Sequence, residues 1–172
     1  ARSRYLPDRR DLNRCFPGRA GGSLGWRLAH IFLHDVVLRC DFGIDLHSAA
    51  VHRTNLPQTR VTPGDQATAQ MARSFGAPVI LTSTLRDGSL RGEAAARGTP
   101  VLLYEAGEGV RFDEFGVRAG VAGILRVMRD RGMLAAKGIA RARTPSLVCT
   151  ASTWLRAPSG GLLRTFRAEG DV

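Results

Sequence analysis

Histidine and carboxylate side chains stand where two apolar stretches of this sequence end, and hydrolases use such side chains as metal ligands and as bases. Asp45 and His47 close the stretch FGIDLH, and Glu105 closes PVLLYE. A zinc hydrolase needs about three protein ligands, an open position for water and a carboxylate base near that water. His47 could be a ligand, Asp45 could orient it, and Glu105 could be the base. Taken singly, such a histidine is more often structural and such a glutamate is more often solvated.

A polar loop near the start of the chain adds a second kind of chemistry. Asn13 and Arg14 stand together in DRRDLNRCFPG. An amide beside a planar guanidinium fork is suited to binding a substrate carboxylate. The alternative is that Arg14 pairs with Asp8 or Asp11 and only holds the loop.

Strands and helices alternate along the chain and must position these residues. The apolar runs predict strands over 42–47, 78–82 and 100–109. Periodicity and capping residues predict helices over 23–36, 65–76, 89–98 and 113–132. Gly, Pro and polar residues predict loops over 1–22 and 51–64.

Two of these helices carry an apolar face. In the first it consists of Leu24, Leu28, Ile31, Phe32 and Val36. In the last, Arg118, Arg126, Arg129 and Asp130 lie opposite a face made of Val117, Val121, Ile124, Leu125 and Met128.

This alternation predicts an α/β fold, with a mixed, largely parallel sheet and helices on both faces. If strands 42–47 and 100–105 run parallel, their ends open on the same side of the sheet. His47 and Glu105 then approach one crevice. After residue 146 the pattern changes to short β segments, and we predict a small β-rich domain that begins there.

Composition excludes several classes of protein. The net charge of +10 arises almost entirely from arginines scattered among Gly and Ala, so we do not expect a nucleic-acid partner. No apolar run is long enough to cross a bilayer, and we expect no membrane partner. The three cysteines are widely spaced and form no C-x-x-C pair, which is typical of reduced thiols in a cytoplasmic protein.

Three ordered motifs resemble a known family. DLNRCFPG (11–18), DLHSA (45–49) and YEAGE (104–108) are similar to segments of the succinylglutamate desuccinylase/aspartoacylase family, relatives of zinc carboxypeptidases. WLRAPSGGLLR (154–164) resembles the opening of that family's β-rich C-terminal domain. The resemblance implies a zinc carboxypeptidase-like catalytic domain over 1–132, a linker over 133–145 and the start of the β-rich domain over 146–172.

The resemblance also implies an activity, which is zinc-dependent hydrolysis of small N-acylated amino acids or related amides. One zinc ion is held by His47 together with a His and a Glu from an H-x-x-E segment. The other implied roles are the water-activating base for Glu105, the oxyanion contact for Arg4, the substrate-carboxylate contacts for Asn13, Arg14 and Arg91, and support of the ligand for Asp45.

The sequence departs from the family in one respect, because it contains no H-x-x-E. Both ends of the chain look cut, and we expect the missing ligands to lie upstream of Ala1. The alternative is a catalytically inactive binding or scaffold module that keeps the fold without its metal. His30 and His34 stand one helical turn apart, but HIFLH lacks the glutamate of a metalloprotease helix, so we favour packing roles for them. We expect a small-molecule partner, and the sequence leaves open a homo-oligomer.

Overall fold

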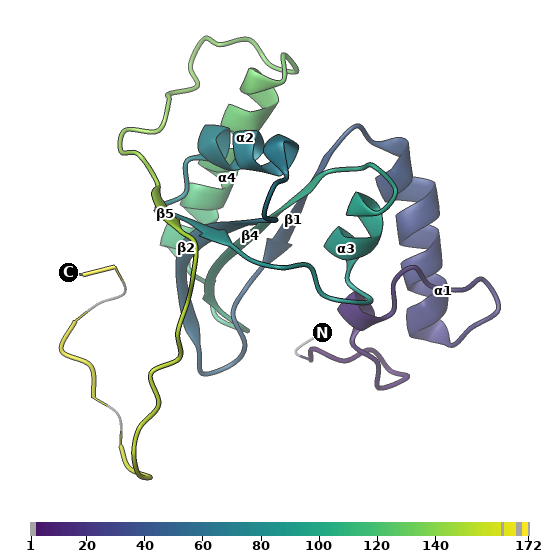
Figure 1. Cartoon of the computed structure of the whole chain (residues 1–172), viewed down its shortest axis with the longest axis horizontal. Coiled ribbons are helices and arrows are strands. Elements are labelled where there is room, and N and C mark those ends of the chain that lie inside the picture. Colours follow the sequence, from purple (N-terminus) through teal and green to yellow (C-terminus); the bar gives the residue numbers. More distant parts are fainter. Residues whose placement is uncertain (1–2, 163, 168–169, 172) are drawn as a thin grey trace.

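A five-stranded mixed sheet forms the centre of the computed structural model, which describes residues 3–162, 164–167 and 170–171 (Figure 1). Its spatial order is β1-β4-β2-β3-β5. β1 and β4 pair in parallel, as do β2 with β3 and β3 with β5, whereas β2 and β4 are antiparallel. The strands are β1 (Gly43–His47), β2 (Thr54–Val61), β3 (Val79–Thr82), β4 (Val101–Glu108) and β5 (Leu147–Cys149). The predicted mixed, largely parallel sheet is confirmed.

Helices cover both faces of this sheet, as predicted (Figure 1). α2 and α4 pack on one face, and α1 and α3 pack on the other. A single 3₁₀ turn, Leu12–Arg14, interrupts the N-terminal loop, and α1 continues through a π turn, Phe32–Val36, and a 3₁₀ turn, Val37–Arg39. The helices are α1 (Leu24–Ile31), α2 (Gln66–Phe75), α3 (Leu90–Ala95) and α4 (Glu114–Asp130). Among the described residues, no helix combines the length and apolar character needed to cross a membrane.

Each face of the sheet has its own hydrophobic core, because successive side chains of a strand point to opposite faces. On β4, Leu102 and Tyr104 belong to the core under α2 and α4, which includes Phe75. Val101 belongs to the core under α1 and α3, which includes Leu33. Leu103 and Glu105 lie two and four positions after Val101 on β4, so their side chains point to the same face as Val101, toward α1 and α3.

The predicted loop over residues 51–64 is wrong, because most of it forms β2 near the centre of the sheet. Pro57 and the polar residues around it obscure the strand in the sequence. Pro57, Thr59 and Val61 are buried, which is the alternation of a strand. The register with β4 shifts between Asn55 and Gln58, so Pro57 lies at a bulge, where its missing N–H is tolerated.

The apolar face predicted for the first helix is not the face that packs, and the face predicted for the last helix packs only in part. In α4, Gly116, Gly120, Gly123 and Val127 are buried and Ile124 packs against the core, whereas Val117 and Val121 are about half exposed. A Cβ atom would lie 2.9 Å from Ala106 at Gly116 and 3.1 Å from Tyr104 at Gly120, both on β4, and within 2.5 Å of the Phe75 ring of α2 at Gly123. The glycines therefore allow α4 to approach both β4 and α2 closely. In the first helical segment, all five residues of the predicted face are exposed, and the buried residues are Gly25, Ala29, Leu33 and Val37.

The C-terminal segment contributes β5 to the main sheet, where it pairs with β3. After Cys149, the described residues form no helix or strand. The β-rich domain over 146–172 stays a prediction, and residues 163, 168–169 and 172 of that range lie outside the described residues.

Candidate functional site

His47 and Glu105 are direct neighbours on the parallel strands β1 and β4. Asp45 is in register with Leu103, two residues earlier on each strand, so all four side chains point to the α1/α3 face. The predicted approach of His47 and Glu105 is therefore confirmed. It depends on two apolar strands that run side by side in the same direction.

The Asp45 carboxylate contacts the His47 ring. The Nε2 atom of His47 lies 2.9 Å from Oδ2 of Asp45, and both side chains are mostly buried. This hydrogen bond raises the pKa of His47 above its ordinary value, and the charge of Glu105 adds to the effect, while burial opposes it. With Nε2 held by Asp45, Nδ1 is the ring nitrogen that can contact a metal or substrate.

Glu105 is held from the opposite side by β2. Its Oε2 accepts hydrogen bonds from Nδ2 of Asn55 and from Nη2 of Arg60, both at 2.8 Å. Asn55 and Arg60 are five positions apart and would lie on opposite faces of a regular strand. The bulge between Asn55 and Gln58 shifts the alternation, so both donors reach one oxygen. No donor among the described residues contacts Oε1, which can face a reactant.

Asn55 and Arg60 are the site residues that the sequence did not reveal. They lie on β2, which we predicted as a loop. The alternating Pro57, Thr59 and Val61 were the one signal for that strand, and they would have placed Arg60 on the opposite face from these buried residues.

Arg91 projects from α3 onto the same part of the sheet. Its guanidinium donates to the backbone oxygens of Arg60 and Thr84 and to the hydroxyl of Ser83. Burial lowers its pKa, and the positive charge of Arg60 lowers it further, while Glu105 partly compensates. Arg91 is thus part of the charged group around Glu105, although its present contacts also anchor α3.

Asn13 and Arg14 lie beside α3. Oδ1 of Asn13 accepts a hydrogen bond from the backbone N–H of Leu90, the first residue of α3. Its side-chain NH₂ makes no described contact and is available to a substrate. Arg14 is exposed and donates to the carbonyl of Asn13, so neither Asp8 nor Asp11 pairs with it.

Arg4 is bound by a carboxylate and is not brought to the cluster by any contact among described residues. Its Nε and Nη2 donate to Oδ2 of Asp11 at 2.9 and 2.7 Å. Asp11 also accepts from the backbone N–H of Asn13. In this structure Arg4 therefore supports the loop that carries Asn13, and its predicted oxyanion role stays a prediction.

The described residues supply one zinc ligand and not a full set. His47 has a free nitrogen and a carboxylate that orients it, which fits a ligand with its supporting residue. No group of three His, Cys, Asp or Glu residues suited to a metal occurs in the part of the chain that the structure describes. His30 and His34 stack with ring centroids 4.5 Å apart on the first helical segment and have no third partner of this kind.

Comparison with known proteins assigns the family. The model of the succinylglutamate desuccinylase/aspartoacylase catalytic domain matches residues 1–131. The chain therefore belongs to the succinylglutamate desuccinylase/aspartoacylase family, whose named members are deacylases.

Solved structures agree with this assignment. A succinylglutamate desuccinylase/aspartoacylase from Rhodobacter sphaeroides is 30% identical, with a TM-score of 0.75 over 85% of this chain and 46% of that one. A succinylglutamate desuccinylase from Silicibacter sp. TM1040 (22% identity, TM-score 0.77, 85% of this chain and 46% of that one) shares the fold. So does the product-bound ectoine utilization protein EutE (DoeB) from Ruegeria pomeroyi (24%, 0.76, 85% and 47%). The chain spans about half the length of these proteins. No curated protein is significantly similar to it.

Proposed function

We propose that the chain carries part of the active site of a zinc-dependent deacylase that hydrolyses small N-acylated amino acids. The observation that supports this most is the Glu105 carboxylate, fixed at Oε2 by Asn55 and Arg60 beside the His47–Asp45 pair. Zinc bound at His47, together with ligands other than the described residues, would supply a water with a pKa lowered toward about 7.

In this proposal Glu105 is the general base. Its free Oε1 takes a proton from the attacking water and returns it to the leaving amine. Asn55 and Arg60 are positioning residues, because they hold the other oxygen and so fix the direction of Oε1. A base held in one orientation needs no reorganisation during the reaction.

The substrate carboxylate is bound by cations and an amide near α3. The NH₂ group of Asn13 is free, and Arg14 is exposed next to it. Arg91 is a second guanidinium on the same face of the sheet. These groups suit a small anionic substrate, since guanidinium forks bind carboxylates through two parallel hydrogen bonds.

The test is release of free carboxylate from N-acetyl and N-succinyl amino acids by the zinc-supplemented complete gene product, followed by proton NMR, because the described residues supply one zinc ligand only. We expect Glu105→Gln to reduce turnover by a factor of about 10²–10⁴, as loss of a general base does. Glu114→Gln is the matched control, because Glu114 is exposed and pairs only with Arg118 among the described contacts. Equal turnover by Glu105→Gln and the unsubstituted chain would refute the assigned role.

Positioning by Arg60 has a separate readout. Arg60→Met removes the cation beside Glu105 while keeping much of the side-chain length. We expect a lower kcat with little change in KM, because Arg60 contacts the base and not the substrate. A rise in KM alone would place Arg60 in substrate binding instead.

A second candidate function is binding without catalysis, which the incomplete set of metal ligands favours. A cavity of about 320 Å³ next to β1 offers a place for a small apolar ligand between Leu46 and Val117, Val121 and Ile124 of α4. Zinc content measured by plasma mass spectrometry separates the two. The measurement is made on the complete gene product, because the described residues supply one ligand only. About one zinc per molecule that is lost in His47→Ala supports the deacylase, whereas no zinc in the unsubstituted complete protein supports the binding module.

A further inference from the structure

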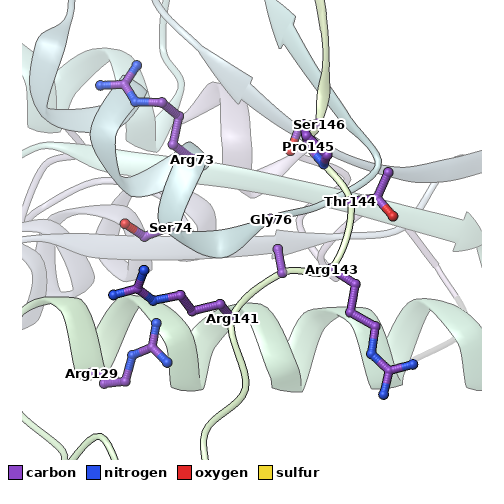
Figure 2. A pocket seen from close by; sticks show the side chains of 10 residues that line it. Arg73, Ser74, Gly76, Arg129, Arg141, Arg143, Thr144, Pro145 and Ser146 are labelled. Carbon is purple, nitrogen blue, oxygen red and sulfur yellow. The ribbon is translucent and has the colours of Figure 1, made fainter.

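A second cavity, of about 330 Å³, lies away from the Glu105 cluster, where the C-terminal ends of α2 and α4 meet the segment that leads to β5 (Figure 2). α2 contributes Arg73 and Ser74, α4 contributes Arg129, and the rest of the lining comes from Gly76 and residues 141–146. The cavity therefore joins three parts of the chain that are distant in sequence.

Positive charge dominates this cavity. Arg73, Arg129, Arg141 and Arg143 all line it. Arg129 uses one nitrogen to donate to the carbonyl of Ile139, whereas the other three guanidinium groups make no hydrogen bond or ion pair within the described part of the chain. Among the described residues, the carboxylate that bonds a lining side chain is that of Asp130, which accepts from the hydroxyl of Ser74 at 2.7 Å.

Two of the four arginines converge. Figure 2 shows the guanidinium groups of Arg129 and Arg141 pointing toward one another below Ser74, whereas Arg143 points away from them. Arg73 and Arg129 stand in the last turns of their helices, where the helix dipole favours cations. That explanation does not extend to Arg141, which lies on an irregular segment. Two guanidinium groups that face each other without a carboxylate between them repel unless an anion occupies the space.

We propose that this cavity binds the phosphate group of a small phosphorylated molecule, held between Arg129 and Arg141. A phosphate dianion offers several acceptor oxygens to two guanidinium forks at once, and arginine binds phosphate through paired hydrogen bonds. The cavity has room for an organic part beside the phosphate. The proposal is independent of the deacylase site, because it shares no residue with it.

Binding would also fix the segment 141–146 against α2 and α4. The next residue, Leu147, donates its backbone N–H to the carbonyl of Pro78 and begins β5. A phosphate between Arg129 and Arg141 thus ties this segment to the main domain directly before the strand that joins the sheet.

The experiment is calorimetric titration of the full chain with glycerol 3-phosphate and with inorganic phosphate, in about 0.15 M NaCl to screen diffuse attraction. Arg141→Gln is the test variant, because Arg141 is exposed and its loss removes no described contact. Arg27→Gln is the matched control, since Arg27 is exposed on α1 and its substitution changes the net charge equally. Hydrogen exchange of residues 141–147 is measured in parallel.

We expect glycerol 3-phosphate to bind, with an affinity about tenfold lower in Arg141→Gln and unchanged in Arg27→Gln. Bound phosphate should slow hydrogen exchange in 141–147. Equal affinity for both phosphates assigns the site to the phosphate group alone and supports the proposal, while tighter binding of the ester shows that the organic part is also bound. Absence of binding, or an equal loss in both variants, overturns the proposal.

Discussion

Gly123→Ala tests the packing of α4 against Phe75 of α2, in the core that also contains Tyr104 of β4. A Cβ atom at Gly123 would lie 2.3–2.5 Å from three atoms of the Phe75 ring. Phe75 is fully buried, and its ring packs against Tyr104 with a centroid distance of 4.9 Å. The ring therefore has no free space into which it can move.

Two effects of opposite sign set the expected magnitude. Alanine gains about 1 kcal/mol over glycine in a helix interior. Overpacking a core costs about 1–3 kcal/mol and more where nothing can yield, as at Phe75. We expect the free energy of unfolding to fall by about 2 kcal/mol, which lowers the Tm of a domain of this size by roughly 4–8 °C.

The assay is thermal and urea unfolding followed by circular dichroism. Gly21→Ala is the control, because a Cβ there meets no atom within 4 Å. In a Phe75→Leu background the cost of Gly123→Ala should shrink, since the smaller side chain leaves room for the new methyl group. A higher Tm for Gly123→Ala would show that helix propensity outweighs packing and would refute the close approach of α4 to Phe75.

Three further predictions concern titratable side chains. In the metal-free chain, Asp45→Asn should lower the pKa of His47, measured by NMR. The native pKa of His47 is raised, so the His47–Asp45 pair contributes its full stability below the pKa of the unfolded state, near 6.5. That contribution is lost as the pH rises through the native pKa. Cys40 is exposed, whereas Cys15 is buried and its pKa is raised. A thiol reagent should therefore label Cys40 on the order of 10-fold faster than Cys15, as followed by mass spectrometry. Equal labelling rates would contradict the burial of Cys15. Burial raises the pKa of Tyr104 to about 12, and its hydroxyl donates to a backbone carbonyl of α4. Tyr104→Phe should therefore lower the free energy of unfolding in urea by about 1–3 kcal/mol. An unchanged free energy of unfolding would show that this hydrogen bond is not made.

The parts of the site that lie on apolar strands could be predicted from the sequence. β4 begins with a continuous apolar run, which is typical of a strand buried on both faces, and β1 is a shorter, partly apolar segment; polar side chains stand at or near the end of each. Their parallel pairing places His47 beside Glu105, as expected. The Asp45–His47 contact follows from the same pattern, because residues two apart on a strand share a face.

Only the tertiary structure revealed what holds Glu105. Asn55 and Arg60 reach it because β2 pairs antiparallel with β4 and carries a bulge, and pairing between distant segments leaves no local periodicity in the sequence. The same reason explains α4. Val117 and Val121 belong to the predicted apolar face, yet they are exposed while Gly120 and Gly123 are buried, since the close approach of α4 to Tyr104 and Phe75 decides which side of the helix packs. The sequence by itself determined β1, β3 and β4, the polar ends of β1 and β4, and the family. The strand β2, the register and the packing distances were decided by the fold, because they depend on contacts between residues remote in sequence.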